Sequence, residues 1–83
     1  MKSILYFSAE WCRPCSTFFP VVQEVCNATG TALQKVDIDQ NKSLAEQYSI
    51  SAVPTMVFMK NGEPSYRHSG IMPKNDLLNL LKV

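Results

Sequence analysis

The chain has 83 residues, of which 46% are hydrophobic and 18% are charged, and its formal net charge is +1 at pH 7. A chain of this length forms one small domain, here residues 1–83, and buries roughly 60% of the surface that its unfolded form exposes. The nearly balanced charge disfavours a polyanionic partner, so we expect no nucleic-acid binding. No apolar run approaches the roughly 20 residues that cross a bilayer, so we expect no membrane span.

The cysteine count and the N-terminus bear on the compartment. Three cysteines are an odd number, unlike the paired set of a secreted scaffold held by disulfides. Met1–Ser3 leads directly into an apolar run, which leaves no room for a signal peptide. We therefore expect a cytoplasmic protein, in which a lasting structural disulfide is disfavoured. We also expect a monomer.

Taken in chain order, the apolar periodicity predicts alternating strands and helices. Pro20 interrupts the first helical pattern, Gly30 ends it, and Asn61-Gly62 predicts a tight hairpin. The expected elements are a strand over about 3–8, a helix over 12–28, a strand over 32–38, a helix over 42–48, a strand over 56–59, a strand ending near 69 and a helix over 74–82.

This order of elements predicts the fold class. A strand, a helix and a second strand form a parallel pair joined by a right-handed crossover. The later hairpin adds two antiparallel strands. The simplest closed arrangement is an α/β fold, with a mixed four-stranded sheet and three helices packed on both of its faces.

Cys12 and Cys15 are the residues that indicate chemistry. They follow the first strand and begin the first helix, where unpaired backbone N–H groups and the helix dipole stabilise a negative charge. The pKa of the Cys12 thiol is therefore expected to lie below that of a free thiol. Cys15 lies within the first turn of this helix and can close a disulfide with Cys12. This geometry suits reversible dithiol–disulfide exchange.

A zinc site is the alternative interpretation of this cysteine pair. Only Cys26 and His68 remain as further ligands, and Cys26 lies eleven residues beyond Cys15, about 16 Å along a helix. We therefore expect no metal site. Cys26 is interpreted as a small buried hydrophobe, and His68 as an ordinary strand residue.

The cysteine pair is followed by further landmarks along nearly the whole chain. Together the landmarks are Ala9–Cys15, Pro20, Lys35–Asn41, Tyr48, Ile50, Val53–Thr55, Lys60–Glu63 and Gly70. A lone Cys-x-x-Cys is a weak signal, but a strand before it and a Val-Pro-Thr segment with a hairpin after it make it specific. In these residues the chain resembles the thioredoxin family, which implies a thioredoxin-like fold and a thiol–disulfide exchange activity.

The resemblance implies roles for particular residues. Cys12 is implied as the attacking nucleophile, Cys15 as the resolving thiol, and Pro54 as a cis-proline that faces the pair. Arg13 and Pro14, between the cysteines, are implied as supporting residues. A shallow apolar rim for docking a protein substrate is implied for Trp11, Ala52, Val53, Pro54, Gly70 and Ile71.

The chain also departs from the family pattern. The expected sheet has four strands, without the N-terminal strand and helix of the full-length form. Arg13 replaces the usual glycine, and Ser8 stands where an aromatic residue is common. Tyr6 occupies the position of the buried aspartate beneath the resolving cysteine. A phenol with a pKa near 10 cannot accept a proton at neutral pH as a carboxylate can.

Lys35 and Asp37 offer a substitute for that aspartate. Lys35 matches the lysine that usually pairs with it, and Asp37 lies two residues along the same strand, so both side chains leave on one face. We hypothesise that Asp37 pairs with Lys35 and that water carries the proton from Cys15. The alternative is a solvated strand edge without a role in the reaction.

The sequence therefore predicts an oxidoreductase that reduces protein disulfides through a mixed disulfide and needs no bound cofactor. Electrons would come from a thioredoxin reductase-like enzyme or from glutathione. A glutathione-dependent, glutaredoxin-like protein is one alternative, although Ser69–Pro73 lacks the Gly-Gly-x-Asp stretch that holds glutathione in glutaredoxins. A non-catalytic docking module is a second alternative, because docking needs the same apolar rim.

Overall fold

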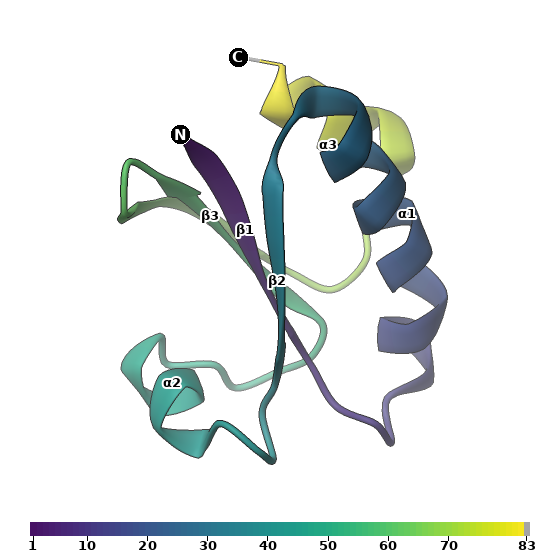
Figure 1. The fold of residues 1–83 in the computed structure, drawn as a ribbon. Coiled ribbons are helices and arrows are strands. Elements are labelled where there is room, and N and C mark those ends of the chain that lie inside the picture. The colour runs from purple at the N-terminus through teal and green to yellow at the C-terminus, as the bar shows by residue number, and fades with distance from the viewer. Residues whose placement is uncertain (83) are drawn as a thin grey trace.

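A computed structural model describes residues 1–82, which form four strands and three helices (Figure 1). The type and the order of the elements predicted from the sequence are confirmed, and the predicted boundaries lie within one residue of those observed. The elements are β1 (Lys2–Ser8), α1 (Arg13–Thr29), β2 (Ala32–Asp37), α2 (Lys42–Gln47), β3 (Thr55–Lys60), β4 (Glu63–Ser69) and α3 (Lys74–Leu81).

The strands form one mixed sheet in the order β2-β1-β3-β4. β1 pairs in parallel with β2 and antiparallel with β3, and β4 pairs antiparallel with β3. Helices α1 and α3 cover one face of the sheet and α2 covers the other (Figure 1). The predicted fold class, a mixed four-stranded sheet with helices on both faces, is therefore confirmed.

Strand β1 lies inside the sheet and contributes to two cores. Successive side chains of a strand point to opposite faces, so Ile4 and Tyr6 pack beneath α1 and α3, whereas Leu5 and Phe7 pack toward α2. All four side chains are buried. Each such burial stabilises the fold by roughly 1.5–3 kcal/mol, which holds the end of β1 firmly below the cysteine pair.

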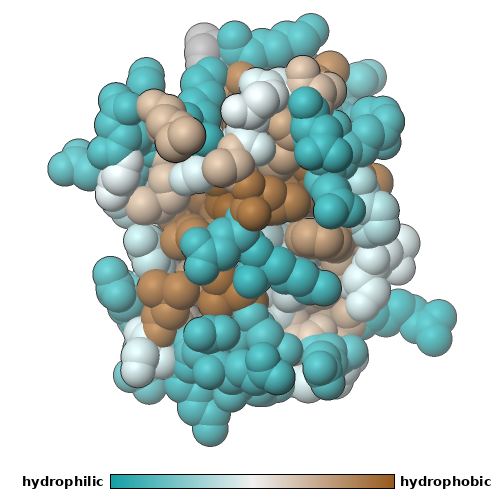
Figure 2. Space-filling model, viewed as in Figure 1, coloured by the Kyte–Doolittle hydropathy of each residue, from teal (hydrophilic) through white to brown (hydrophobic). Residues whose placement is uncertain are grey.

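The outer strand β2 lies at one edge of the sheet. Seen from this side, apolar surface gathers in the middle of the molecule, and hydrophilic side chains surround and cross it (Figure 2). Lys35 and Asp37 belong to this strand, and its register places Lys35 opposite Tyr6 and Asp37 opposite Ser8. The end of β2 is thereby placed next to the end of β1.

Helix α1 begins at the cysteine pair because Cys12 caps it. Cys12 has an extended backbone, and its carbonyl accepts the N–H of Ser16 at 3.3 Å, the first bond of the helix. The helix then continues through Pro20 and ends before Gly30, whose φ of 67° is left-handed and favours glycine. The first turn of α1 is thus fixed directly behind β1.

Candidate active site

Cys12 and Cys15 are joined as a disulfide, with Cα atoms 5.3 Å apart. Both residues are buried. The backbone N–H of Cys15 donates to Cys12 Sγ at 3.3 Å, so the sulfur of Cys12 itself caps the helix. In the reduced protein the same N–H and the positive end of the helix dipole stabilise a thiolate at Cys12.

The loop before β3 lies against Cys12. The Val53–Pro54 peptide bond is cis, and the Val53 carbonyl oxygen lies 3.8 Å from Cys12 Sγ. Gly70 donates its N–H to the Pro54 carbonyl at 2.7 Å, and Thr55 Oγ1 donates to the Ala52 carbonyl at 2.7 Å. These bonds hold the loop beside Cys12 Sγ.

Two large apolar side chains stand exposed beside this loop. Trp11 is 69% exposed and Ile71 is 62% exposed. The indole Nε1 of Trp11 donates to Asp39 Oδ2 at 2.9 Å, which holds the ring in place. Asp39 belongs to the Lys35–Asn41 segment that carries the family resemblance. The sequence does not predict its bond to Trp11, because the bond joins side chains 28 positions apart. Arg13 and Pro14 are exposed at the start of α1.

On the Cys15 side of the disulfide, Tyr6 lies beneath the first turn of α1. This side chain is fully buried, and its hydroxyl donates to the Cys15 carbonyl at 2.7 Å. Its ring packs against Phe18 and Phe19, with centroids 6.3 and 5.2 Å away. Desolvation by burial raises the pKa of Tyr6 to about 12. Tyr6 therefore stays protonated and holds the first turn of α1 without accepting a proton.

Lys35 and Asp37 do not form the ion pair that we hypothesised from the sequence. The Asp37 carboxylate oxygen Oδ1 accepts the backbone N–H groups of Asp39 at 2.8 Å and Gln40 at 3.3 Å. Lys35 Nζ instead lies 4.7 Å from the centroid of the Phe19 ring, a cation–π contact. The pairing is wrong because Asp37 ends its strand, where its side chain caps the turn that follows.

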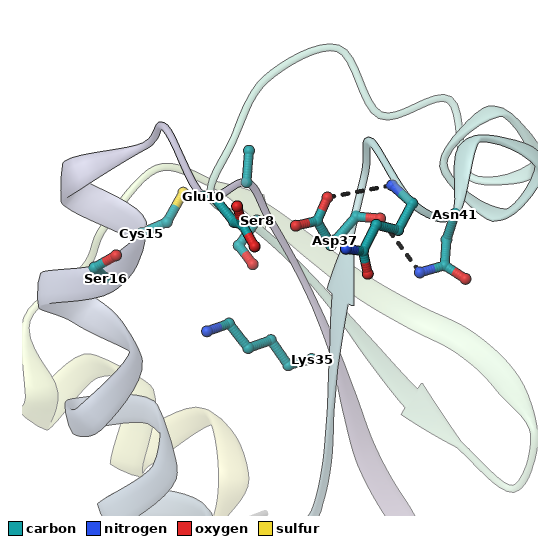
Figure 3. A pocket seen from close by; sticks show the side chains of 9 residues that line it. Ser8, Glu10, Cys15, Ser16, Lys35, Asp37 and Asn41 are labelled. Carbon is teal, nitrogen blue, oxygen red and sulfur yellow. Dashed lines mark hydrogen bonds between the residues drawn. The ribbon is translucent and has the colours of Figure 1, made fainter.

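A polar cavity of about 410 Å³ lies behind Cys15, between the start of α1 and the ends of β1 and β2 (Figure 3). The small side chain of Ser8 is 2% exposed and forms part of its wall. The lining residues are Ser8, Ala9, Glu10, Cys15, Ser16, Lys35, Asp37, Gln40 and Asn41. The same-face placement of Lys35 and Asp37 that the sequence predicts is thus observed, although the cavity itself was missed. The only feature of the sequence that pointed to the cavity was Ser8, a small residue where the family commonly has an aromatic one.

The remaining titratable candidates lie away from this centre. Cys26 is buried in the core beneath α1 and α3, where desolvation raises the pKa of its thiol to about 11. His68 Nε2 lies 3.2 Å from the Ile71 carbonyl oxygen. Among residues 1–82, no group of three or more histidine, cysteine or acidic side chains is placed to hold a metal ion. None of the helices in this part of the chain has both the length and the apolarity of a bilayer span.

Comparison with known proteins identifies this arrangement. The family model described as Thioredoxin matches residues 1–83. The chain is 35% identical over 82 residues to the thioredoxin of Mycoplasmoides gallisepticum, across 98% of this chain and 82% of that relative. The chain belongs to the thioredoxin family. It is accordingly a thiol–disulfide oxidoreductase, and the Cys12–Cys15 disulfide is its redox-active centre.

Other thioredoxins agree in sequence and in fold. Thioredoxin Y of rice, a chloroplastic protein, is 41% identical over 78 residues; the match covers 92% of this chain but 46% of that relative, so the chain spans about half its length. A mutant thioredoxin from Halobacterium salinarum superposes with a TM-score of 0.93 at 33% identity, covering 98% of this chain and 72% of that one. The thioredoxin of Fasciola hepatica has a TM-score of 0.88 at 34% identity, covering 98% and 78%.

Proposed function

We propose that this thioredoxin-family protein reduces protein disulfides, with Cys12 as the attacking nucleophile and Cys15 as the resolving thiol. The observation that carries this assignment is the position of Cys12 as the cap of α1, where its sulfur accepts the N–H of Cys15. A charge on Cys12 is stabilised there by the helix start. Cys15 lies within the first turn of α1, but among residues 1–82 no backbone N–H donates to its sulfur. The reactive thiolate therefore belongs to Cys12.

The reaction has two exchange steps. The Cys12 thiolate attacks one sulfur of the substrate disulfide; the other substrate sulfur leaves with the bonding electron pair, and a mixed disulfide remains. Cys15 loses its proton and attacks Cys12 Sγ, and the second substrate sulfur leaves as a thiolate. The substrate gains two electrons, and the protein is left with the Cys12–Cys15 disulfide.

We propose that the substrate docks on the apolar rim beside Cys12. The exposed Trp11 and Ile71 offer apolar contact, and the backbone of Val53 offers hydrogen bonds to an extended substrate segment. The residues of the proposed docking rim are Trp11, Ala52, Val53, Pro54, Gly70 and Ile71. Arg13 and Pro14 lie beside this rim at the start of α1, and we propose that they support the active site.

We propose that the protein works in the cytoplasm as a monomer, without a bound cofactor, and receives electrons from a thioredoxin reductase-like enzyme. Reduction must come from outside, because the dithiol holds only one electron pair. The relatives named thioredoxin support this donor over glutathione. Glutathione remains the alternative outcome of the test below.

The test is NADPH consumption during reduction of a protein disulfide, with thioredoxin reductase present and glutathione absent. We expect steady turnover with the wild-type protein and none above background with Cys12→Ser. Cys26→Ala is the matched control, because it removes a buried cysteine outside the centre and keeps both reactive thiols. Turnover by Cys12→Ser contradicts the assignment, and turnover that starts only when glutathione is added identifies the glutathione-dependent alternative.

A further inference from the structure

The Cys15 thiol must lose a proton before it attacks, and its neighbours limit where that proton goes. Tyr6 donates its own hydroxyl proton to the Cys15 carbonyl, and its raised pKa of about 12 keeps it protonated. Lys35 lines the cavity behind Cys15, but an ammonium group has no acceptor site. The proton acceptor must therefore be reached through the cavity.

The cavity is suited to carry that proton in water. Its volume of about 410 Å³ is far above what one water molecule needs, and most of its lining side chains are polar. It opens to solvent, because Glu10, Ser16, Gln40 and Asn41 in its wall are exposed. Ser8 leaves this space free, since a larger side chain at the same buried position would fill it.

Asp37 offers a positioned carboxylate in this cavity. It lies at the end of β2, opposite Ser8 in the register, and its carboxylate points from β2 toward the cavity (Figure 3). Oδ1 is fixed by the backbone N–H groups of Asp39 and Gln40, whereas Oδ2 has no hydrogen-bond partner within residues 1–82. One oxygen thus anchors the group and the other remains available to water.

The other charged groups that face the cavity are Glu10, from the loop before α1, and Lys35, from β2; α1 itself contributes only Cys15 and Ser16. Glu10 is exposed and makes no hydrogen bond through its side chain in the described part of the chain. Proton transfer by a side chain requires that the side chain be positioned. The fixed carboxylate of Asp37 meets this requirement and Glu10 does not.

We propose that Asp37 receives the proton of Cys15 through water in the cavity that Ser8 leaves open, an inference that rests on the proposed two-step reduction. The Cys15 S–H bond breaks and its proton passes through water to the Asp37 carboxylate. The Cys15 thiolate forms a bond to Cys12 Sγ, and the bond from Cys12 Sγ to the substrate sulfur breaks. Asp37 acts through water and is therefore a positioning residue for the resolving step.

The test separates the two exchange steps with the chromogenic disulfide dithionitrobenzoate, mixed in equal amount with the reduced protein. The first coloured thiolate reports the attack by Cys12, and the second reports the resolving step by Cys15. Asp37→Asn keeps the size of the side chain and the oxygen that accepts both backbone N–H groups. Glu10→Gln is the matched control, because it removes the other carboxylate of the same cavity.

We expect Asp37→Asn to slow the second release by roughly tenfold at pH 6 and to leave the first release unchanged, since a positioned base contributes about 10²–10⁴ and an acceptor that works through water gives less. The deficit should shrink as the pH rises, because hydroxide takes over, and imidazole should restore part of the rate. Glu10→Gln should stay within about twofold of the wild type. A second release that is unchanged in Asp37→Asn, or slowed equally at every pH, overturns the proposal.

Ser8→Leu gives a second and independent test, because it narrows the cavity without removing a charge. We expect the folded variant, judged by circular dichroism, to release the second thiolate more slowly than the wild type. A wild-type second release in this variant overturns the cavity as the route. A wild-type protein that gives no first release at all contradicts the proposed reduction itself, which is a separate failure.

Discussion

The two sides of the disulfide are built differently. On the Cys12 side, backbone groups form most of the environment of the sulfur. They are the start of α1, the loop with the cis Val53–Pro54 bond, and the hydrogen bond from the Gly70 N–H to the Pro54 carbonyl. On the Cys15 side, individual side chains decide the environment, because Tyr6 fills the space below and Ser8 leaves a polar cavity open. The Cys12 side, which we propose attacks the substrate, follows the thioredoxin pattern. On the Cys15 side, Tyr6 stands where the family resemblance implies a buried aspartate.

This difference leads us to expect that the two steps of the proposed reaction can be changed separately. Attack would depend on how well the start of α1 stabilises a thiolate at Cys12. The resolving step would depend on where the Cys15 proton goes, which side chains of β1 and β2 determine. Substitutions on one side should therefore affect one step and spare the other.

Replacing each of the two cysteines in turn with serine should have the strongest effect on activity. Cys12→Ser should lower the reduction of a protein disulfide to the rate without protein, because the thiol proposed to attack the substrate is removed. Cys15→Ser should still attack and should hold the substrate as a mixed disulfide, visible on a non-reducing gel and released by dithiothreitol. A stable adduct with Cys12→Ser would reverse the two roles.

Two substitutions of Tyr6 distinguish its contribution to the stability of the fold from any part in proton transfer. Because its ring is fully buried, Tyr6→Ala should lower the free energy of unfolding by about 3–5 kcal/mol. Tyr6→Phe keeps the ring and removes only the bond to the Cys15 carbonyl, which costs about 1–2 kcal/mol. Urea denaturation of the oxidised protein measures both. Tyr6→Phe should leave the second thiolate release within about twofold, and a larger loss would make the hydroxyl part of the proton route.

Alkaline pH should weaken the fold through Tyr6 and Cys26. Burial raises their pKa values to about 12 and about 11, so the unfolded chain loses these protons at lower pH than the folded protein. Stability is therefore complete below about pH 9 and falls as the pH rises toward 12, by at most about 3 kcal/mol for each group. Urea denaturation of the oxidised protein from pH 8 to 11 measures the loss. Tyr6→Phe should flatten the curve above pH 10, and an unchanged slope would contradict this assignment.

The smallest expected effect belongs to Arg13. Arg13 is exposed and follows Cys12 in the sequence. We expect its charge to favour the Cys12 thiolate and thereby the reduced protein. An exposed charge interaction contributes about 0–1 kcal/mol, so Arg13→Gly should lower the reduction potential by about 20 mV at most. Equilibration against a thiol buffer of known potential measures the shift. A change much larger than this would show that Arg13 is less solvent-screened than its exposure indicates.

Most of the fold was predictable because each element carries a local signal. Apolar periodicity defines β1, β3 and α1, and the Asn61-Gly62 turn defines the hairpin of β3 and β4. The positions of Cys12 and Cys15 follow from the same pattern, since a strand must end and a helix must begin there. Their roles in the reaction, like those of the docking rim, stay predictions.

The side-chain contacts of the resolving side were not predictable in this way. The sequence places Lys35 and Asp37 on one face, but it does not reveal that Asp37 turns toward the backbone N–H groups of the following turn. That bond depends on the loop conformation after β2. The cavity depends equally on the small size of the Ser8 side chain, and hydrophobic periodicity carries no information on the volume that side chains leave empty.

The most direct test follows both thiolate releases from dithionitrobenzoate in the wild type, Arg13→Gly and Asp37→Asn at pH 6. We expect Arg13→Gly to slow only the first release, by up to about fivefold, and Asp37→Asn to slow only the second, by roughly tenfold. This crossed pattern is what two separately built sides require. If both substitutions change the same release, or each changes both, the separation of the attacking side from the resolving side is wrong.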